Sequence, residues 1–448
     1  MPNPYLHGTF APVSEERSDD HELPVTGALP PDLEGRLLRN GPNPVVVPED
    51  ESDYHWFAGD GMIHAISLSG GRASGYRNRW VRTRALAAKL GTVPPNGPSE
   101  PVDGVANTHV VRHAGTTLAL VESGFPHAVS PGLDRARIHD FDGALASPMT
   151  AHPKVDPQTD ELVFFGSDPF GPPFLRYHLV DAAGTMVHTA EVDIPRAVLM
   201  HDFGVTATRV VLLDLPVVFD LGLAVAGRSI PYRWMPDAGA RLGVASRSAG
   251  ATDPRWITID PVYVFHVLNC FDEGDTVVMD VVRYDRAFDT EPGGAVASGL
   301  PCLARWRIDP VAGRVSEQRL DDAAVEFPRI DPAVAGLPHR YGYCTRLTDR
   351  PEDPTPQGLV KYDLVRDEAT RFEPGAHRFP GEPVFVRAAD GRGEDEGWVL
   401  TVVDDATTGR SDLVVLDATS FAGPPVATVH LPARVPQGFH GSWVPTGT

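Results

Sequence analysis

Short segments rich in β-branched and aromatic residues recur along the whole chain and are bounded by glycine, proline, aspartate or asparagine. Clear examples are "ELVFFGSD" (161–168), "DTVVMDVVRYD" (275–285) and "GWVLTVVDD" (397–405). Glycine and proline account for 43 and 44 of the 448 residues, which favours short strands and frequent turns. Helical periodicity is scarce: residues 82–91 are the best helix candidate and 221–227 a weaker one. The pattern predicts an all-β chain.

No block of like charges and no low-complexity linker divides the chain, so we expect residues 1–448 to form a single unit. An all-β unit of this size is most simply a β-propeller, a barrel or a pair of sandwiches. Dividing 448 residues among seven blades gives about 64 residues each. The sequence has no repeated signature, such as one Trp-Asp dipeptide per blade. Periodicity therefore leaves the three architectures open.

The charge and the cysteines restrict the partners and the compartment. A formal charge of −21 would repel nucleic acid and anionic lipid head groups, so membrane contact would have to be apolar. Cys270, Cys302 and Cys344 are widely spaced, with no C-x-x-C pair, which indicates reduced thiols rather than disulfides or a zinc site. The start of the sequence does not read as a signal peptide, and no apolar run reaches 18 residues. We expect a cytoplasmic protein, with peripheral membrane contact through an apolar patch as an option.

Four of the 17 histidines stand out because each adjoins apolar residues at what would be the inner end of a strand. They are His152 in "TAHPKVDP", His201 in "LMHDFG", His266 in "YVFHVLNC" and His440 in "QGFHGSW". Their separations are 49, 65 and 174 residues, close to one, one and three blades. Four blades could thus each send one imidazole to a central axis, where four neutral imidazoles suit a divalent first-row metal. For any single histidine, an ordinary core or surface role is the commoner expectation.

Three glutamates also lie in unusually apolar surroundings: Glu122 in "LALVESGFP", Glu326 in "AVEFPRID" and Glu382 in "PGEPVFV". A metal-bound imidazole needs an acceptor on its other nitrogen, and a carboxylate can serve. The alternative interpretation is that the three are surface glutamates on edge strands.

Several longer motifs together resemble the carotenoid cleavage oxygenase family, which includes apocarotenoid oxygenases and lignostilbene dioxygenases. They include "GALPPDLEGRLLRNGPNP" (27–44), "YHWFAGDGMIHA" (54–65), "LALVESGFPHAV" (118–129) and "LPARVPQGFHGSW" (431–443). The resemblance implies a seven-bladed β-propeller capped by a dome of loops and short helices. It implies that the four histidines bind Fe(II), that the three glutamates hold these ligands from outside, and that the C-terminal tail closes the last blade.

The resemblance also suggests which residues face the substrate. Thr108, fourteen positions before the first glutamate, would lie where its methyl group can crowd an open iron position. Phe57, Val121, Leu199 and Phe265 would line the substrate tunnel. Segments 85–91 and 221–236 could form an apolar tunnel mouth that touches a membrane.

By the same resemblance, the reaction adds both atoms of O2 across one C=C bond and yields two carbonyl products. Lignostilbene-cleaving relatives typically carry a lysine immediately before the first glutamate, whereas this chain has Val121. We therefore expect a carotenoid or apocarotenoid substrate. Cleavage of a stilbene or phenylpropanoid is the alternative reaction, and a non-catalytic interaction platform is a third interpretation.

Overall fold

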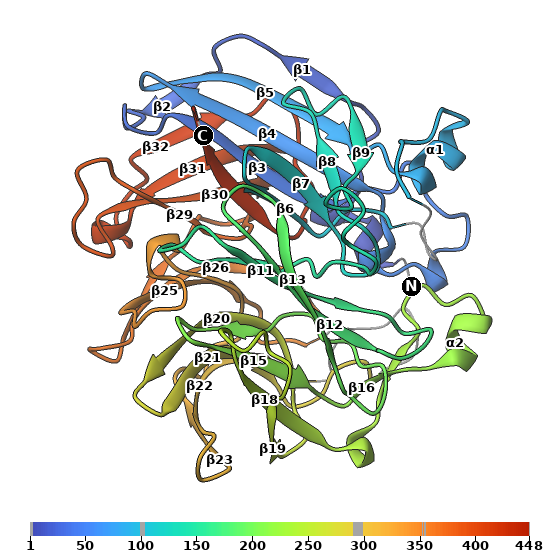
Figure 1. Ribbon diagram of the computed structural model, residues 1–448. Coiled ribbons are helices and arrows are strands. Elements are labelled where there is room, and N and C mark those ends of the chain that lie inside the picture. Colours follow the sequence, from blue (N-terminus) through green and yellow to red (C-terminus); the bar gives the residue numbers. More distant parts are fainter. Residues whose placement is uncertain (1–2, 99–103, 290–298, 352, 354, 448) are drawn as a thin grey trace.

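The computed structural model describes residues 3–98, 104–289, 299–351, 353 and 355–447. In this part of the chain, seven antiparallel sheets of four to six strands stand around a common axis as the blades of a β-propeller (Figure 1). The innermost strands of neighbouring blades contact one another near the axis, as β14 and β24 do with β20. The predicted all-β, seven-bladed fold is confirmed.

Blades 2 to 6 follow one another along the chain, and each runs from an inner strand to an outer one. Their strands, from the axis outward, are β6 (His109–His113), β7 (Thr116–Leu120), β8 (His127–Val129) and β9 (Ala136–Ile138) in blade 2; β10 (Lys154–Val155), β11 (Leu162–Ser167), β12 (Leu175–Val180) and β13 (Met186–Val192) in blade 3; β14 (Gly204–Val205), β15 (Arg209–Asp214), β18 (Ala240–Ser246) and β19 (Arg255–Ile259) in blade 4; β20 (Tyr263–Glu273), β21 (Thr276–Tyr284), β22 (Cys302–Asp309) and β23 (Arg314–Arg319) in blade 5; β24 (Val325–Arg329), β25 (Tyr341–Leu347), β26 (Pro356–Asp363) and β27 (Glu368–Phe372) in blade 6.

Blades 1 and 7 combine strands from both ends of the chain. Their strands, from the axis outward, are β33 (Gly441–Pro445), β3 (Gly35–Pro42), β4 (Gly61–Ser69), β5 (Arg72–Trp80) and β1 (Arg17–Asp19) in blade 1; β28 (Arg378–Pro380) and β29 (Val384–Arg387), which both pair with β30 (Gly397–Asp405), then β31 (Arg410–Asp417), β32 (Ala427–His430) and β2 (Val25–Gly27) in blade 7. The C-terminal strand thus completes the first blade, and β2, the second strand of the chain, completes the last. The expectation that the tail closes the last blade is wrong, because β33 pairs with β3 and not with a strand of blade 7.

Both helix candidates form helices, and both lie on the same side of the ring (Figure 1). Helix α1 (Arg84–Leu90) begins where the Thr83 side chain accepts a hydrogen bond from the Leu86 amide, and it ends at Gly91 with φ = 64°. Helix α2 (Leu221–Val225) lies in an excursion from blade 4, between the paired strands β16 (Val217–Phe219) and β17 (Tyr232–Trp234). Seven 3₁₀ helices complete the described elements: η1 (Pro4–Leu6), η2 (Gly8–Phe10), η3 (Glu51–Asp53), η4 (Trp56–Ala58), η5 (Pro236–Ala238), η6 (Pro332–Val334) and η7 (Ala418–Ser420).

The blades pack face to face, so the central strands bury both of their faces. In β15, every residue from 210 to 214 is buried, and the one carboxylate among them, Asp214, accepts a hydrogen bond from Arg241 Nε at 2.6 Å. Strands buried on both faces appear in the sequence as continuous apolar runs rather than as an alternation. The hairpins between them are tight: Ser69 pairs directly with Arg72 across Gly70 and Gly71, whose φ values of 56° and 72° suit glycine.

Candidate metal centre

The four histidines and three glutamates selected from the sequence lie together at one end of the inner strands. These strands all begin on the same face of the ring. His152, His201 and His440 come one to three residues before β10, β14 and β33, and His266 lies within β20. The sequence predicts each histidine at the inner end of a strand; in the structure three of them precede an inner strand and His266 lies within one. The four histidines come from blades 3, 4, 5 and 1.

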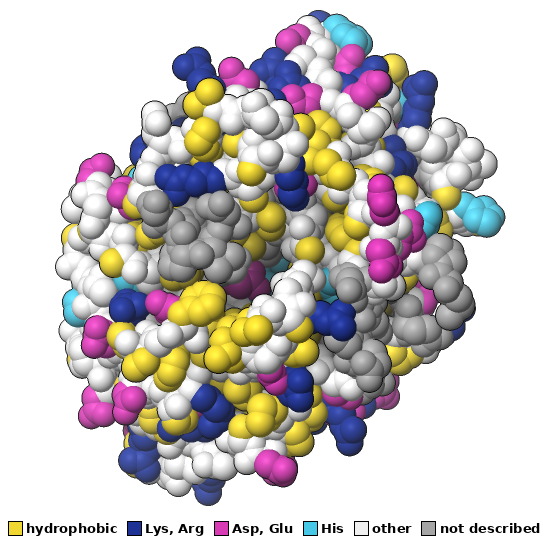
Figure 2. Space-filling view, turned by 90° about the vertical axis from the view of Figure 1, so that its right-hand side faces the viewer, with side chains coloured by type: hydrophobic (Ala, Val, Ile, Leu, Met, Phe, Trp, Pro, Cys, Tyr) yellow, Lys and Arg dark blue, Asp and Glu magenta, His cyan; other side chains and the backbone are white. Residues whose placement is uncertain are grey.

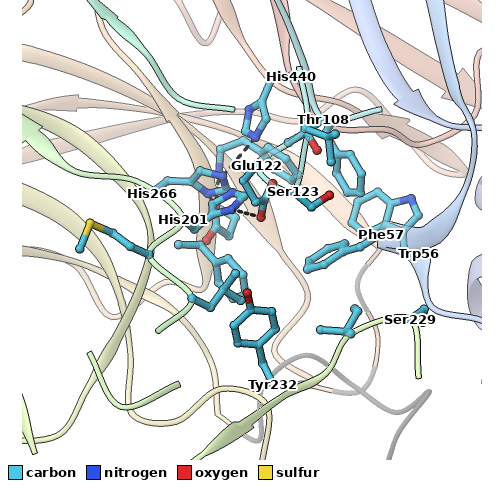
Figure 3. A pocket seen from close by; sticks show the side chains of 18 of the residues that line it. Trp56, Phe57, Thr108, Glu122, Ser123, His201, Ser229, Tyr232, His266 and His440 are labelled. Carbon is cyan, nitrogen blue, oxygen red and sulfur yellow. Dashed lines mark hydrogen bonds and ion pairs between the residues drawn. The ribbon is translucent and has the colours of Figure 1, made fainter. Parts of the chain in front are cut away.

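The four imidazoles form a compact, buried cluster (Figure 3). One ring nitrogen from each histidine lies within 4.8 Å of the others. His152 Nε2 is 2.9 Å from His201 Nε2, and His266 Nε2 is 3.1 Å from His440 Nε2. All four residues are buried, with exposed fractions of 3–8%.

Three of these imidazoles are held from behind by the three glutamates. His201 Nδ1 donates to Glu122 Oε1 at 2.8 Å and His440 Nδ1 donates to Glu382 Oε1 at 2.8 Å. The shortest of the three bonds joins His266 Nδ1 to Glu326 Oε2, at 2.5 Å.

Glu122, Glu326 and Glu382 come from blades 2, 6 and 7, which are the three blades that supply no histidine of the cluster. Every blade therefore contributes one group to the centre. Among the described residues, His152 has no carboxylate partner, and its loop is tied to that of His201 through Thr150, whose hydroxyl donates to the His201 carbonyl and accepts from the His152 amide.

These hydrogen bonds leave a set of lone pairs that fits a cation. His266 and His440 both donate Nδ1–H to a carboxylate, so each Nε2 carries a lone pair. Two such lone pairs 3.1 Å apart repel one another unless a positive charge lies between them. Nitrogen donors of this kind suit divalent first-row metals, and three surrounding carboxylates add favourable charge. The residues present therefore fit a metal site.

Burial keeps lone pairs available on two of the four imidazoles, those of His152 and His440. Burial, followed by the neighbouring imidazoles, holds the pKa of His152 and of His440 well below 6.5. Burial also acts to lower the pKa of His201, but the Glu122 carboxylate and its hydrogen bond outweigh this effect and raise that pKa. The same pairing with His201 overcomes desolvation and lowers the pKa of Glu122.

Interruptions in strand pairing determine the direction of the His266 and Glu326 side chains. His266 lies in an interruption of the β20–β21 register between Val264 and Val267, and Glu326 lies at a similar interruption between β24 and β25. Bulges of this kind redirect side chains near functional sites. The residue after Glu326, Phe327, has a left-handed backbone with φ = 53°, and its ring stacks on the His266 imidazole with centroids 5.7 Å apart.

A large apolar cavity opens onto the cluster. Its volume is about 920 Å³, and its walls include His201, His266 and His440. All five residues predicted to face the substrate line it: Phe57, Thr108, Val121, Leu199 and Phe265. The Thr108 hydroxyl donates to Asn107 Oδ1 at 3.0 Å, so this hydroxyl is already engaged.

Only one of the two segments expected at the tunnel mouth lines the cavity. Residues 224 and 228–232 do so, whereas no described residue of α1 does. Leu86 and Ala87 of α1 are buried, and Leu86 packs with Met62 and Trp80, so the apolar face of α1 belongs to the core. Lys89 is not among the lining residues, and it pairs with Asp60 at 2.6 Å.

The structure adds cavity residues that the sequence did not single out. Phe327 packs against the His440 imidazole, and Phe439 packs against Phe57. Tyr284 donates its hydroxyl to Glu326 Oε1 at 2.8 Å. Tyr232 reaches the cavity from β17 (Figure 3). Phe439 could have been found, because it precedes His440 directly. Tyr284 and Tyr232 could not, because each meets the site only through tertiary packing.

Comparisons with known proteins agree over the whole chain. The family model described as retinal pigment epithelial membrane protein matches residues 10–445. A carotenoid cleavage oxygenase from Mycobacterium tuberculosis is 38% identical over 496 aligned residues, which cover 99% of this chain and 98% of the relative.

Two solved structures are similar in fold and in sequence. A cobalt-substituted apocarotenoid oxygenase from Synechocystis superposes with a TM-score of 0.87 at 28% identity and covers 97% of each chain. A lignostilbene dioxygenase from Pseudomonas brassicacearum superposes with a TM-score of 0.88 at 29% identity and covers 99% of each chain.

Proposed function

Because this chain belongs to the carotenoid cleavage oxygenase family, we propose that it uses O2 to cleave one C=C bond of a carotenoid or apocarotenoid into two carbonyl products. The observation that carries the proposal is the opening of a four-histidine cluster directly into a cavity of about 920 Å³ with mostly apolar walls. A non-catalytic platform would have no use for this combination.

We assign the resident metal as Fe(II), held by His152, His201, His266 and His440. Four neutral imidazoles leave the charge of the ion intact, and the cluster is accessible from the cavity. The similar apocarotenoid oxygenase is known in a cobalt-substituted form, which is in keeping with a site for divalent first-row metals. When bound, Fe(II) would supply the redox chemistry that activates O2.

The protein's own residues position the reactants and exclude water. Glu122, Glu326 and Glu382 fix the tautomer and the orientation of three imidazoles, so that each Nε2 points inward. Phe57 and Phe265 pack edge to face, with ring centroids 6.2 Å apart, on the wall of the cavity. An extended apolar substrate would be bound by burial of its hydrocarbon at about 25 cal/mol per Å². No residue is required as a nucleophile or as a general base.

The wall next to the metal favours a polyene over a phenol. Val121 lies beside Glu122, is 7% exposed and lines the cavity. A hydroxystilbene whose phenol faced this side chain would leave a polar group unpaired, at a cost of about 1–3 kcal/mol. Cleavage of a stilbene or phenylpropanoid remains the second candidate, because the lignostilbene dioxygenase shares the fold at full coverage.

We further propose that the cavity mouth touches a membrane to collect its substrate. Around the hollow on the face that carries α1 and α2, apolar side chains are frequent (Figure 2). Leu221 and Val225 of α2 are 64% and 81% exposed, and Phe170, a residue of the cavity lining, is 59% exposed. Exposed apolar residues gathered at one rim are typical of a lipid contact. Among the described residues, no helix is long and apolar enough to span a bilayer.

The test is a substrate panel with metal analysis. Purified protein is assayed for bound metals, and the iron-loaded enzyme is supplied with an apocarotenal, a carotene, resveratrol and isoeugenol under O2. We expect bound iron and two carbonyl products from a polyene. A protein that retains no iron, or that cleaves only the aromatic alkenes, would contradict the proposal.

A further inference from the structure

The cavity contains a phenol group that the proposed reaction does not use. Three tyrosines line the cavity, namely Tyr5, Tyr232 and Tyr284. Tyr284 donates its hydroxyl to Glu326, so it is already engaged. The hydroxyls of Tyr5 and Tyr232 have no hydrogen-bond partner among the residues that the structure describes. Each is thus a donor available to a molecule in the cavity.

Tyr232 is the better placed of the two. In Figure 3, the hydroxyl is at the end of the Tyr232 side chain that is directed toward Glu122 and His201. The ring is supported from the side by Phe219, with centroids 5.6 Å apart at an angle of 72°, and β16 and β17 hold the two residues in register. Tyr5, by contrast, is only 5% exposed and is confined by Trp56 and Phe10.

Some other hydroxyl and amide groups in the cavity wall are committed to the protein. Thr345 Oγ1 donates to the Gly381 carbonyl, and Gln437 Nε2 donates to the Phe379 carbonyl. Four further donors on this wall have no hydrogen-bond partner among the described residues, namely the indole N–H of Trp56 and the hydroxyls of Ser123, Ser167 and Ser229. Tyr232 is held by its pairing in β17 and by the Phe219 ring, so it is a fixed donor on a mostly apolar wall. A site built to hydrogen-bond a substrate oxygen discriminates against analogues that lack it, because its polar group is then left unpaired.

The surroundings also select the charge of the group that Tyr232 can bind. Burial, and to a lesser extent the charge of Glu122, raise the pKa of Tyr232, so the phenol stays protonated and donates. The nearby Glu122 carboxylate would repel a carboxylate on the substrate. A neutral oxygen, in a carbonyl or a hydroxyl group, meets both conditions.

We propose that Tyr232 is a specificity-determining residue that donates a hydrogen bond to a neutral oxygen of the substrate, so that the chain prefers an oxygenated apocarotenoid to a hydrocarbon carotene. This inference rests on the proposed polyene cleavage and names the substrate class within it. The oxygen would lie in the same cavity as the double bond that is cleaved, because Tyr232 and the histidine cluster share its walls.

The test compares two substrates that differ only at one end. Iron-loaded wild type, Tyr232→Phe and Tyr5→Phe are assayed with an apocarotenal and with the polyene of equal length in which a methyl group replaces the aldehyde. We expect wild type to prefer the aldehyde about tenfold in kcat/KM, which corresponds to 1.4 kcal/mol. Tyr232→Phe should lose this preference, mainly through a higher KM for the aldehyde and with a smaller change in kcat. Tyr5→Phe should retain it.

Each other outcome is decisive. A preference that survives Tyr232→Phe, or that disappears in Tyr5→Phe instead, overturns the assignment. An apocarotenoic acid that is cleaved better than the aldehyde overturns the requirement for a neutral oxygen. Failure of the wild type on all polyenes, with turnover of resveratrol, would reject the proposed function itself. In that case, wild type and Tyr232→Phe are assayed with stilbenes that have or lack a 4-hydroxyl group. Loss of the preference for the hydroxylated stilbene in the variant supports Tyr232 as the hydrogen-bond donor, and an unchanged preference rejects it.

Discussion

Replacing Glu326 by glutamine removes one charge from behind the metal centre and little else. The Glu326 carboxylate accepts three hydrogen bonds: Oε1 accepts from the Tyr284 hydroxyl at 2.8 Å, and Oε2 accepts from His266 Nδ1 at 2.5 Å and from the Phe327 amide at 2.6 Å. A glutamine whose carbonyl takes the place of Oε2 keeps the last two. Its amide group then faces the Tyr284 hydroxyl, which can rotate and accept instead of donating. The imidazole of His266 keeps its orientation and loses only the neighbouring charge.

The expected size of the effect follows from that geometry. Changes to the groups that orient metal-bound imidazoles typically cost about 10- to 100-fold in metal affinity or activity. Because Glu326→Gln preserves the hydrogen bonds, we expect the lower end, about tenfold, which corresponds to about 1.4 kcal/mol. In the double variant Glu326→Gln/Tyr284→Phe, the buried amide loses its acceptor, and an unsatisfied buried group costs about 1–3 kcal/mol more. Tyr284→Phe alone should have a smaller effect than either.

Metal affinity is measured by competition with a chelator, using Fe(II) without oxygen and, in parallel, Co(II). Thermal unfolding of the metal-free proteins reports separately on the fold. Glu368→Gln, which makes the same chemical change at an exposed position of β27, is the matched control and should behave as wild type. Metal affinity of Glu326→Gln within twofold of wild type would refute the reasoning and would make Glu326 an ordinary strand residue.

Three further changes test the ligands, the wall and the rim. His201→Ala should abolish metal retention while circular dichroism shows an intact β-fold, and the exposed control His21→Ala should retain the metal; full metal content in His201→Ala would reject its role as a ligand. Val121→Lys should lower kcat/KM for an apocarotenal at least tenfold, because it places an ammonium group on an apolar wall, and an unchanged value would show that substrate does not pass this residue. Val225→Asp should weaken sedimentation with neutral liposomes, whereas Val311→Asp, at a 73% exposed position away from the rim, should not; equal binding by both would argue against membrane contact through α2.

Many strands can be predicted from the sequence, because strands buried on both faces consist of continuous apolar runs. The run at 275–285 corresponds to β21 (Thr276–Tyr284), and the run at 397–405 corresponds to β30 (Gly397–Asp405). The number of blades cannot be predicted from sequence patterns, because adjacent blades share no repeated motif. It came from the resemblance to a family, which the comparisons confirm.

The assignment of the tail to a blade failed for a physical reason. Ring closure in a propeller can place a terminal strand in either of the two blades that meet at the closure. What decides here is pairing: β33 lies antiparallel to β3, with Leu37 opposite Trp443 and Leu38 opposite Ser442. A contact between residues some 400 positions apart leaves no mark in local sequence. The separation of 174 residues between His266 and His440 reflects the same closure.

The four histidines and three glutamates could be named from sequence, but their division among the blades could not. Tyr232 could not be predicted as a cavity residue for a different reason. It lies in β17, in the connection between two strands of blade 4, rather than on a strand of the blade itself. Phe327 was hidden because its position depends on a left-handed backbone that a phenylalanine rarely adopts. Cavity residues that lie in connections between strands or in irregular backbone are thus the hardest to predict from sequence patterns.

The segment that carries His440 also closes the ring, so metal binding through His440 would be coupled to closure. The His440 amide donates to the Thr108 carbonyl of the neighbouring blade, and the Asn40 amide donates to the His440 carbonyl. One residue later, the Gly441 amide donates to Glu382 Oε2, and a Cβ at Gly441 would lie 2.6 Å from the Leu38 carbonyl oxygen, so the approach requires glycine. A metal that binds only the closed ring stabilises it by RT ln(1 + [M]/Kd), about 2.7 kcal/mol at a hundredfold excess over Kd. The last residues of most chains fray, whereas here the metal would hold them in place through His440.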